Sequence, residues 1–99
     1  MKIKIDQSLK SLEGKEIKDG KNAITLKNIM VEACVTAIKG DEAQSGEEKL
    51  KLYQLATKIQ EAKKEIDLTI EEIALIKDRI GKGYNVLTVG QAWQMLEGK

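Results

Sequence analysis

Four hydroxyl residues in this 99-residue chain each stand three positions before a residue that can return a hydrogen bond, and an apolar pattern of helical spacing follows each one. At a helix start, a Ser or Thr oxygen accepts a hydrogen bond from an unpaired backbone N–H group, and Glu or Gln three residues later returns the bond. The repeated signal predicts where four helices begin. The pairs are Thr25 and Asn28, Ser45 and Glu48, Thr69 and Glu72, and Thr88 and Gln91.

The apolar spacing after each pair sets the expected extent of the helices, which is 26–39, 46–64, 70–80 and 89–96. Gly40 and Gly81 are expected to end the first and third helices, because glycine readily adopts the left-handed conformation that follows a helix. The segment 66–68, between the second and third helices, is expected to be extended.

The first 25 residues carry strand signals instead of helical ones. Residues 2–5 alternate Lys and Ile, and Asp19-Gly20 is a favoured pair for a two-residue type I′ turn, in which both positions need positive φ. Two or three short strands are marginal in water, so this head must pack on the helices. The predicted fold is α+β and mainly α: a single domain with a small N-terminal β-hairpin head over residues 1–25, packed on an array of four short helices over residues 26–99.

The expected helix over residues 26–39 is apolar around most of its circumference. Such a helix is either central in its own fold or shared with another chain. Leu50, Tyr53 and Leu75 lie off the apolar stripes of their helices, and Trp93 is either a core residue or an interface anchor. We therefore expect a homo-oligomer, most simply a two-fold dimer. The candidate interface residues are Met30, Val31, Cys34, Val35, Ile38, Leu50, Tyr53, Leu75 and Trp93.

Histidine is absent from the chain, and Cys34 is the only cysteine. The sequence therefore lacks the commonest general base and the ligands of a structural zinc site, and we expect Cys34 to be a buried structural thiol. The adjacent carboxylates Glu71 and Glu72 diverge by about 100° on a helix, so they do not form a catalytic pair. We expect no enzyme activity, no metal and no cofactor.

The net charge of +1 gives no attraction to nucleic acid or to an anionic membrane. The first residues contain no apolar segment typical of a signal peptide, and the longest apolar runs are about four residues, far short of the roughly 20 that span a bilayer. A single cysteine fits a reducing cytosol. We therefore expect a cytoplasmic protein that binds neither membranes nor nucleic acid.

The segment 77–93 comes nearest to a phosphate-binding site. Its glycines permit close approach of the backbone, and the start of the last helix offers free N–H groups and a positive dipole. The same pattern is typical of an ordinary helix end, turn and N-cap, and it matches neither the P-loop nor the dinucleotide-binding fingerprint. The candidate ligand-binding residues are Lys77, Arg79, Lys82, Tyr84, Thr88, Gly90 and Gln91.

The end of the chain resembles the end of a family of small proteins from tailed bacteriophages and prophages. The motif that carries the resemblance is Val86-Leu87-Thr88-Val89-Gly90-Gln91-Ala92-Trp93-Gln94-Met95-Leu96-Glu97-Gly98, and the stretches 12–15 and 45–49 are also similar. The resemblance implies a small viral protein that acts in the bacterial cytoplasm, as an assembly factor or as an inhibitor or sponge directed against host defence. It brings no functional residues with it.

The first hypothesis of function is a small non-catalytic interaction protein that blocks or assembles a host or phage protein. One alternative is a sponge for a nucleotide-type signalling ligand, with Lys82, Tyr84 and the start of the last helix as its pocket. The other alternative is an accessory protein of phage morphogenesis.

Overall fold

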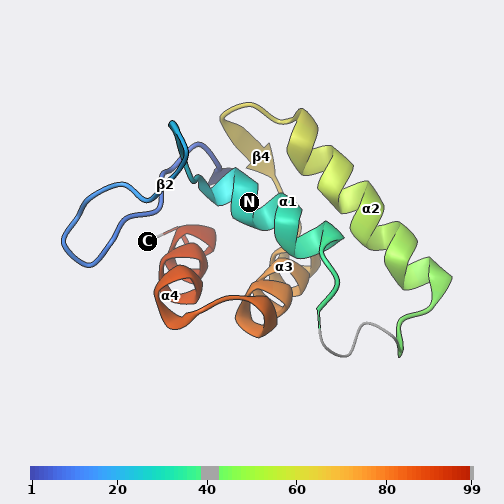
Figure 1. Ribbon diagram of the computed structural model, residues 1–99. Coiled ribbons are helices and arrows are strands. Elements are labelled where there is room, and N and C mark those ends of the chain that lie inside the picture. Colours follow the sequence, from blue (N-terminus) through green and yellow to red (C-terminus); the bar gives the residue numbers. More distant parts are fainter. Residues whose placement is uncertain (39–42, 99) are drawn as a thin grey trace.

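The computed structural model describes residues 1–38 and 43–98, and these residues form four helices and four short strands (Figure 1). The fold is α+β and mainly α, as the sequence predicts. In chain order the elements are β1 (Lys2–Lys4), β2 (Lys18–Asp19), β3 (Asn22–Ala23), α1 (Leu26–Val35), α2 (Gly46–Glu61), β4 (Glu65–Asp67), α3 (Ile70–Gly83) and α4 (Val86–Leu96).

Helix α1 lies in the middle of the molecule and contacts each of the other three helices (Figure 1). Leu26 and Met30 are fully buried, and Ala33 and Cys34 are nearly so. The helix that the sequence predicts to be apolar on most sides is therefore central in its own fold. Met30 and Cys34, which were expected at an interface, are core residues instead, because α2 and α3 pack over the face that carries them.

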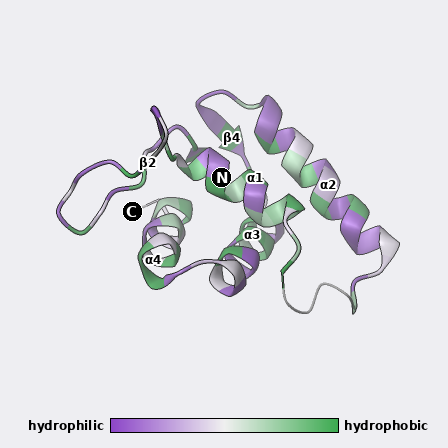
Figure 2. Ribbon diagram, viewed as in Figure 1, coloured by the Kyte–Doolittle hydropathy of each residue, from purple (hydrophilic) through white to green (hydrophobic). Residues whose placement is uncertain are grey.

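Helices α2 and α3 each bury one stripe of side chains and expose the rest. The buried stripe of α2 is Leu52, Leu55, Ala56 and Ile59, and hydrophilic residues recur along the whole helix (Figure 2).

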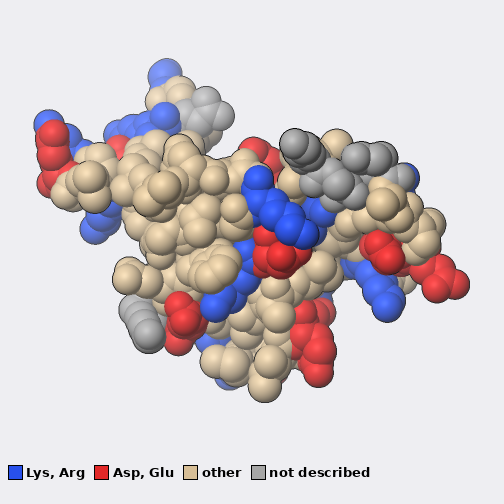
Figure 3. Space-filling model, turned by 90° about the horizontal axis from the view of Figure 1, so that it is seen from below, with Lys and Arg blue, Asp and Glu red and all other residues tan. Residues whose placement is uncertain are grey.

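None of the helices within 1–38 and 43–98 is long and apolar enough to cross a membrane. On the face seen from below, basic and acidic side chains are interspersed rather than gathered by sign (Figure 3).

Strand β1 pairs with β4 in an antiparallel ladder, with Ile3 opposite Ile66 and with Lys2 and Lys4 opposite Asp67 and Glu65. The two isoleucines are buried, while the charged residues lie on the exposed side, where opposite charges face each other across the strands. The segment expected to be extended is therefore the partner of the N-terminal strand. Residues 1–25 do not form one head, because β1 leaves the hairpin to join β4.

The hairpin of β2 and β3 turns one residue later than predicted. Lys18 pairs with Ala23 and Asp19 with Asn22, so the two turn residues are Gly20 and Lys21 rather than Asp19 and Gly20. Gly20 has a φ of +66°, and no non-glycine residue described has positive φ. This combination fits a type II′ turn, which needs positive φ only at its first central position, rather than type I′.

Three of the four predicted N-caps are present. The side chains of Thr25, Ser45 and Thr69 accept hydrogen bonds from the backbone three residues later, and Thr25 and Thr69 form complete capping boxes. The fourth prediction is wrong: α4 begins three residues early, with Asn85 as its N-cap. Asn is as good a cap as Ser or Thr, and it leaves Gln91 free for another role.

Gln91 joins α4 to the loop before the hairpin. Its side-chain oxygen accepts from the backbone N–H of Lys10 (2.8 Å), and its amide nitrogen donates to the Lys10 carbonyl. Leu9, next to Lys10, is buried and accepts and donates backbone hydrogen bonds with Ile17 and Ile24. The hairpin is thus fixed to the helices, as a small β-structure requires.

The predicted ends of the helices are less accurate than their starts. Helix α1 stops at Val35, four residues before the predicted end, and Gly40 lies outside the described residues. Helix α2 stops at Glu61 rather than Lys64. Helix α3 continues through Gly81 to Gly83. A Cβ atom at Gly81 would lie 3.2 Å from the ring of Trp93, so this glycine makes room for the indole and does not end the helix.

The early end of α1 follows from one side chain of α3. The Nε of Arg79 donates to the carbonyl of Ala33 (2.6 Å), and a second guanidinium nitrogen donates to the carbonyl of Thr36 (2.9 Å). A longer helix would use the Ala33 carbonyl for its own next turn, so Arg79 replaces that turn. Arg79 is only 5% exposed, and its positive charge also complements the negative end of the α1 dipole.

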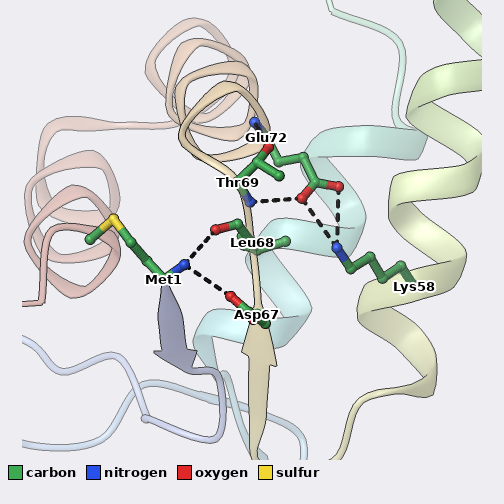
Figure 4. A network of polar contacts seen from close by, with 6 residues as sticks. All are labelled: Met1, Lys58, Asp67, Leu68, Thr69 and Glu72. Carbon is green, nitrogen blue, oxygen red and sulfur yellow. Dashed lines mark hydrogen bonds and ion pairs between the residues drawn. The ribbon is translucent and has the colours of Figure 1, made fainter.

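A polar network links the β1–β4 ladder to α2 and α3 (Figure 4). The amino group of Met1 donates to Asp67 and to the carbonyl of Leu68, both at 2.9 Å. One turn further on, Glu72 accepts from the backbone N–H of Thr69 (2.9 Å) and from Lys58 of α2 (3.1 Å). The capping box of α3 therefore also ties α3 to α2.

Replacing Arg79 tests its role at the end of α1. Arg79→Ala leaves two carbonyls without this partner, and we expect it to lower the free energy of unfolding by about 3 kcal/mol or more. Arg79→Lys keeps the charge without the planar fork, so it should lose about half as much. Urea denaturation measures the free energy of unfolding of both variants. Lys82→Ala, an exposed change on the same helix, is the control and should stay within about 0.5 kcal/mol of wild type; equal effects of Ala at 79 and 82 would contradict this role.

Glu72 gives the stability a defined pH dependence. Partial burial opposes its ionisation, but hydrogen bonds from Thr69 and Lys58 outweigh burial and lower the pKa of Glu72. Its contribution is therefore complete above the unfolded-state pKa of about 4.3 and is lost as the pH falls through the lower folded-state value. Glu72→Gln should destabilise by less than about 1 kcal/mol at pH 7, and by less still near pH 3.

The matched control is Glu71→Gln, the same chemical change at the neighbouring exposed position of α3. Urea denaturation of both variants at the two pH values gives the comparison. If the loss for Glu72→Gln did not shrink toward low pH, the ion pair with Lys58 would not be the source of the effect.

Candidate interaction surface

The end of α1 and the first turns of α2 enclose an apolar groove of about 530 Å³, which we call the α1–α2 groove. Cys34 and Leu52 are buried at its base, and Val35, Ile38 and Tyr53 also line it. Residues 36–38, which follow the end of α1 at Val35, line the groove together with residues of α2. It brings together four of the nine predicted interface residues, namely Cys34, Val35, Ile38 and Tyr53.

Two of these side chains project into solvent although they are apolar or aromatic. Val35 is 61% exposed and Tyr53 is 65% exposed. The charged residues among those described in the lining are Lys49 and Arg79. Arg79 forms hydrogen bonds with the carbonyls of α1. Lys49 is therefore the cation of the groove that a binding partner can contact.

A second hollow, of about 750 Å³, lies on the other side of α1, against the hairpin and the start of α4. Val35 lines both hollows, so the exposed apolar surface continues from one to the other around the last turn of α1. Val31, Tyr84 and Thr88 also line the second hollow. No lysine or arginine is among its described lining residues, and Glu32 is the acidic residue there.

Tyr84 contributes to the fold. It is half-buried against the core and is the C-cap of α3. Burial, followed by a hydrogen bond to the Glu32 carboxylate and its negative charge, raises the pKa of Tyr84 far above its ordinary value. Its hydroxyl therefore stays protonated at neutral pH.

The seven candidate ligand-binding residues do not form one pocket. Arg79 points into the core, Gln91 holds the Lys10 backbone, and Lys82 forms an ion pair with Asp78 (3.0 Å). Tyr84 and Thr88 line the second hollow, Lys77 and Lys82 of α3 lie beside Trp93 of α4, and Lys82 and Tyr84 share a third hollow of about 260 Å³. Gly90 is exposed on α4. The structure therefore does not bring all seven residues to a single cradle, because Arg79 and Gln91 are engaged within the fold and the others lie on different sides of α3 and α4.

The other predicted interface residues lie at different places on the molecule. Val31 is half-buried in the second hollow, and Leu50 is 54% exposed on α2. Leu75 lies between α3 and α2, in a hollow that it shares with Leu55. These positions do not belong to the α1–α2 groove.

Trp93 packs on α3 and remains 36% exposed. Its indole N–H donates to the carbonyl of Lys77 (3.0 Å), and the Lys77 ammonium lies 4.6 Å from the ring centroid. Lys77 is also 3.7 Å from a carboxylate oxygen of Glu97. Trp93 therefore anchors α4 to α3 within the chain, and one part of the ring is left at the surface.

The structural role of Arg79 was not predicted from the sequence, although the sequence contains two indications of it. Arg79 is the only arginine in a chain whose other basic residues are lysines. It also stands three residues after Ile76, and therefore on the buried side of α3. A lone arginine on an apolar stripe indicates fixed, multiple hydrogen bonds that lysine cannot make.

Within the described part of the chain, no group of three His, Cys, Asp or Glu side chains is placed to hold a metal ion. No protein-family model matches this chain, and neither a curated protein nor a solved structure matches it. The functional proposal below is therefore based on the chemistry of the chain's own surfaces.

Cys34 should be nearly inert in the folded protein. Burial raises the pKa of Cys34 to about 11, although the nearby Arg79 charge acts in the opposite direction. At pH 8 only about one thiol in a thousand is then ionised. We expect iodoacetamide to label Cys34 slowly in buffer and rapidly in concentrated urea, as measured by mass spectrometry. Labelling of the folded protein as fast as free cysteine would overturn this assignment.

Proposed function

We propose that this protein is a non-catalytic interaction protein that binds a protein partner through the α1–α2 groove. The observation that supports the proposal is the exposure of Val35 and Tyr53 at a groove whose base is apolar. Exposed apolar groups gathered at a hollow are typical of protein-binding sites, whereas single ones are common on any surface.

The partner that fits this groove best is an amphipathic helix. The groove lies between two helices, and a third helix can lay its apolar side chains between them. Lys49 at the groove favours an acidic residue next to the apolar ones. The exposed phenol of Tyr53 offers both apolar surface and a hydroxyl, which is a combination enriched at interfaces.

Three features support a non-catalytic role. The chain has no histidine, the Cys34 thiol is protonated at neutral pH, and Glu72 serves as a helix cap. Acid–base and nucleophilic catalysis need groups that change protonation or attack a substrate near neutral pH. The described ionisable residues in the groove are Cys34, Lys49, Tyr53 and Arg79, and they include no carboxylate.

The setting that we propose is the cytoplasm of a bacterium infected by a phage. This part of the proposal rests on the similarity of residues 86–98 to phage and prophage proteins. In that setting the protein would block a host protein, such as a component of antiviral defence, or assist the assembly of a phage protein.

The observation nearest to a nucleotide site is a hollow of about 260 Å³ that Lys82 and Tyr84 share, but Glu32 also lines it, and its negative charge disfavours an anion. An anionic ligand needs cations or free N–H groups at its pocket. Lys77 and Lys82 are engaged with carboxylates, and the described lining of the larger hollow contains neither lysine nor arginine. We therefore keep the interaction protein as the single proposed function.

Two lysine variants provide a test. Val35→Lys places a charge in the α1–α2 groove, whereas Leu12→Lys adds a charge at a 93% exposed apolar residue outside both the groove and α4. Each immobilised variant is used to capture proteins from a bacterial lysate, and the captured partner is then purified and titrated. We expect Val35→Lys to weaken its binding at least about tenfold and Leu12→Lys to leave it unchanged.

Circular dichroism and urea denaturation establish that both variants fold. A partner that binds wild type and Val35→Lys equally would overturn the groove as the binding site. A partner lost from both variants would also count against it, because Leu12 is not among the residues that line the groove.

A further inference from the structure

Helix α4 presents an uncharged outward face. It contains no charged residue between Val86 and Leu96, whereas α1, α2 and α3 all carry charged side chains. Val86 is 91% exposed, and Gly90 and Gln94 are also exposed one and two turns later. In the view from below, the side of the molecule where α4 lies shows a broad area without basic or acidic side chains (Figure 3).

Gly90 is in the middle of this face, and the described chain gives no reason for a glycine there. Glycine is one of the least favourable residues in a helix interior. A Cβ atom at Gly90 would meet no described atom within 4 Å, and Gly90 is not among the residues with positive φ. Gly81 differs, because Trp93 occupies the space beside it. A glycine on an open helix face lets the backbone of another helix approach closely.

Charge indicates which helix can approach. In a two-fold dimer, a residue near the axis meets the same residue of the second copy, so a charged residue there faces its own charge. A face without charged residues avoids this repulsion, and among the four described helices α4 is the one that contains no charged residue from Val86 to Leu96. The α1–α2 groove, with Lys49 at its lining, suits a different partner.

We propose that two copies of this chain associate through α4, with the two helices antiparallel and crossing at Gly90. In this arrangement Val86 of one copy lies against Gln94 of the other, because both are four residues from the crossing point. The exposed part of the Trp93 ring lies at the edge of the same contact. The α1–α2 groove stays open in each copy, so this inference does not depend on the proposed function.

The size of the contact sets the expected affinity. Helix α4 has 11 residues and is therefore about 16 Å long. One such crossing buries less than the roughly 800 Å² per partner of a standard stable interface. We therefore expect a dimer that dissociates in the micromolar range rather than an obligate one.

The test uses position 90 itself. Sedimentation equilibrium of the wild type, from about 5 to 500 µM, should show the mass rising from the 11.0 kDa of one chain toward twice that value. Gly90→Lys and Gly90→Glu each put like charges at the crossing point and should weaken self-association at least about tenfold. Both residues are better helix formers than glycine and have open space, so α4 should remain folded.

An equimolar mixture of Gly90→Lys and Gly90→Glu gives the decisive result. The ammonium of one variant and the carboxylate of the other face each other only if position 90 lies beside its own copy, so the mixture should dimerise again. Gln54→Lys, an added charge on the exposed side of α2, is the control and should dimerise like wild type. A wild type that is monomeric at all concentrations, variants that dimerise normally, or a mixture that stays monomeric would each overturn the proposal.

Discussion

The hydrogen bonds from the buried guanidinium of Arg79 to Ala33 and Thr36 decide where α1 stops, and the surroundings of α1 depend on that end. Residues 36–38, which follow this end, line the α1–α2 groove. Because the guanidinium belongs to α3, the same contact fixes α1 against α3 in one register. A polar interaction thus contributes to the shape of an apolar surface, because it fixes the helix end from which these lining residues continue.

The two proposed surfaces differ in the chemistry that selects their partners. The α1–α2 groove combines apolar depth with a cation, so an unlike partner can complement both features. The outward face of α4 carries no charge. Two copies of this face can therefore pack against each other without repulsion between like charges. Separate faces allow one small chain to self-associate and to hold a partner at the same time.

Helix starts could be predicted from the sequence better than helix ends. Thr25, Ser45 and Thr69 act locally, through the backbone three residues away, so their signal is contained in the sequence nearby. The end of α1 depends on Arg79, 46 residues from Ala33, and α3 continues through Gly81 because of Trp93. The candidate sites were predicted in part: Val35, Ile38 and Tyr53 meet in one groove, but Arg79 is buried away from the two exposed lysines, Lys77 and Lys82, which lie together beside Trp93.

The pairing of β1 with β4 has a consequence for the order of folding. Lys2 lies opposite Asp67, so β1 can pair with β4 only after residue 67 has been synthesised. The backbone bonds from Leu68 to Met1 and from Ile5 to Lys64 have the same long sequence separation. Contacts of this kind form late, because the entropy of closing a long loop must be overcome first. The N-terminal segment therefore cannot pair before residues 64–68 have been synthesised. The β1–β4 ladder can form only once these residues have emerged from the ribosome.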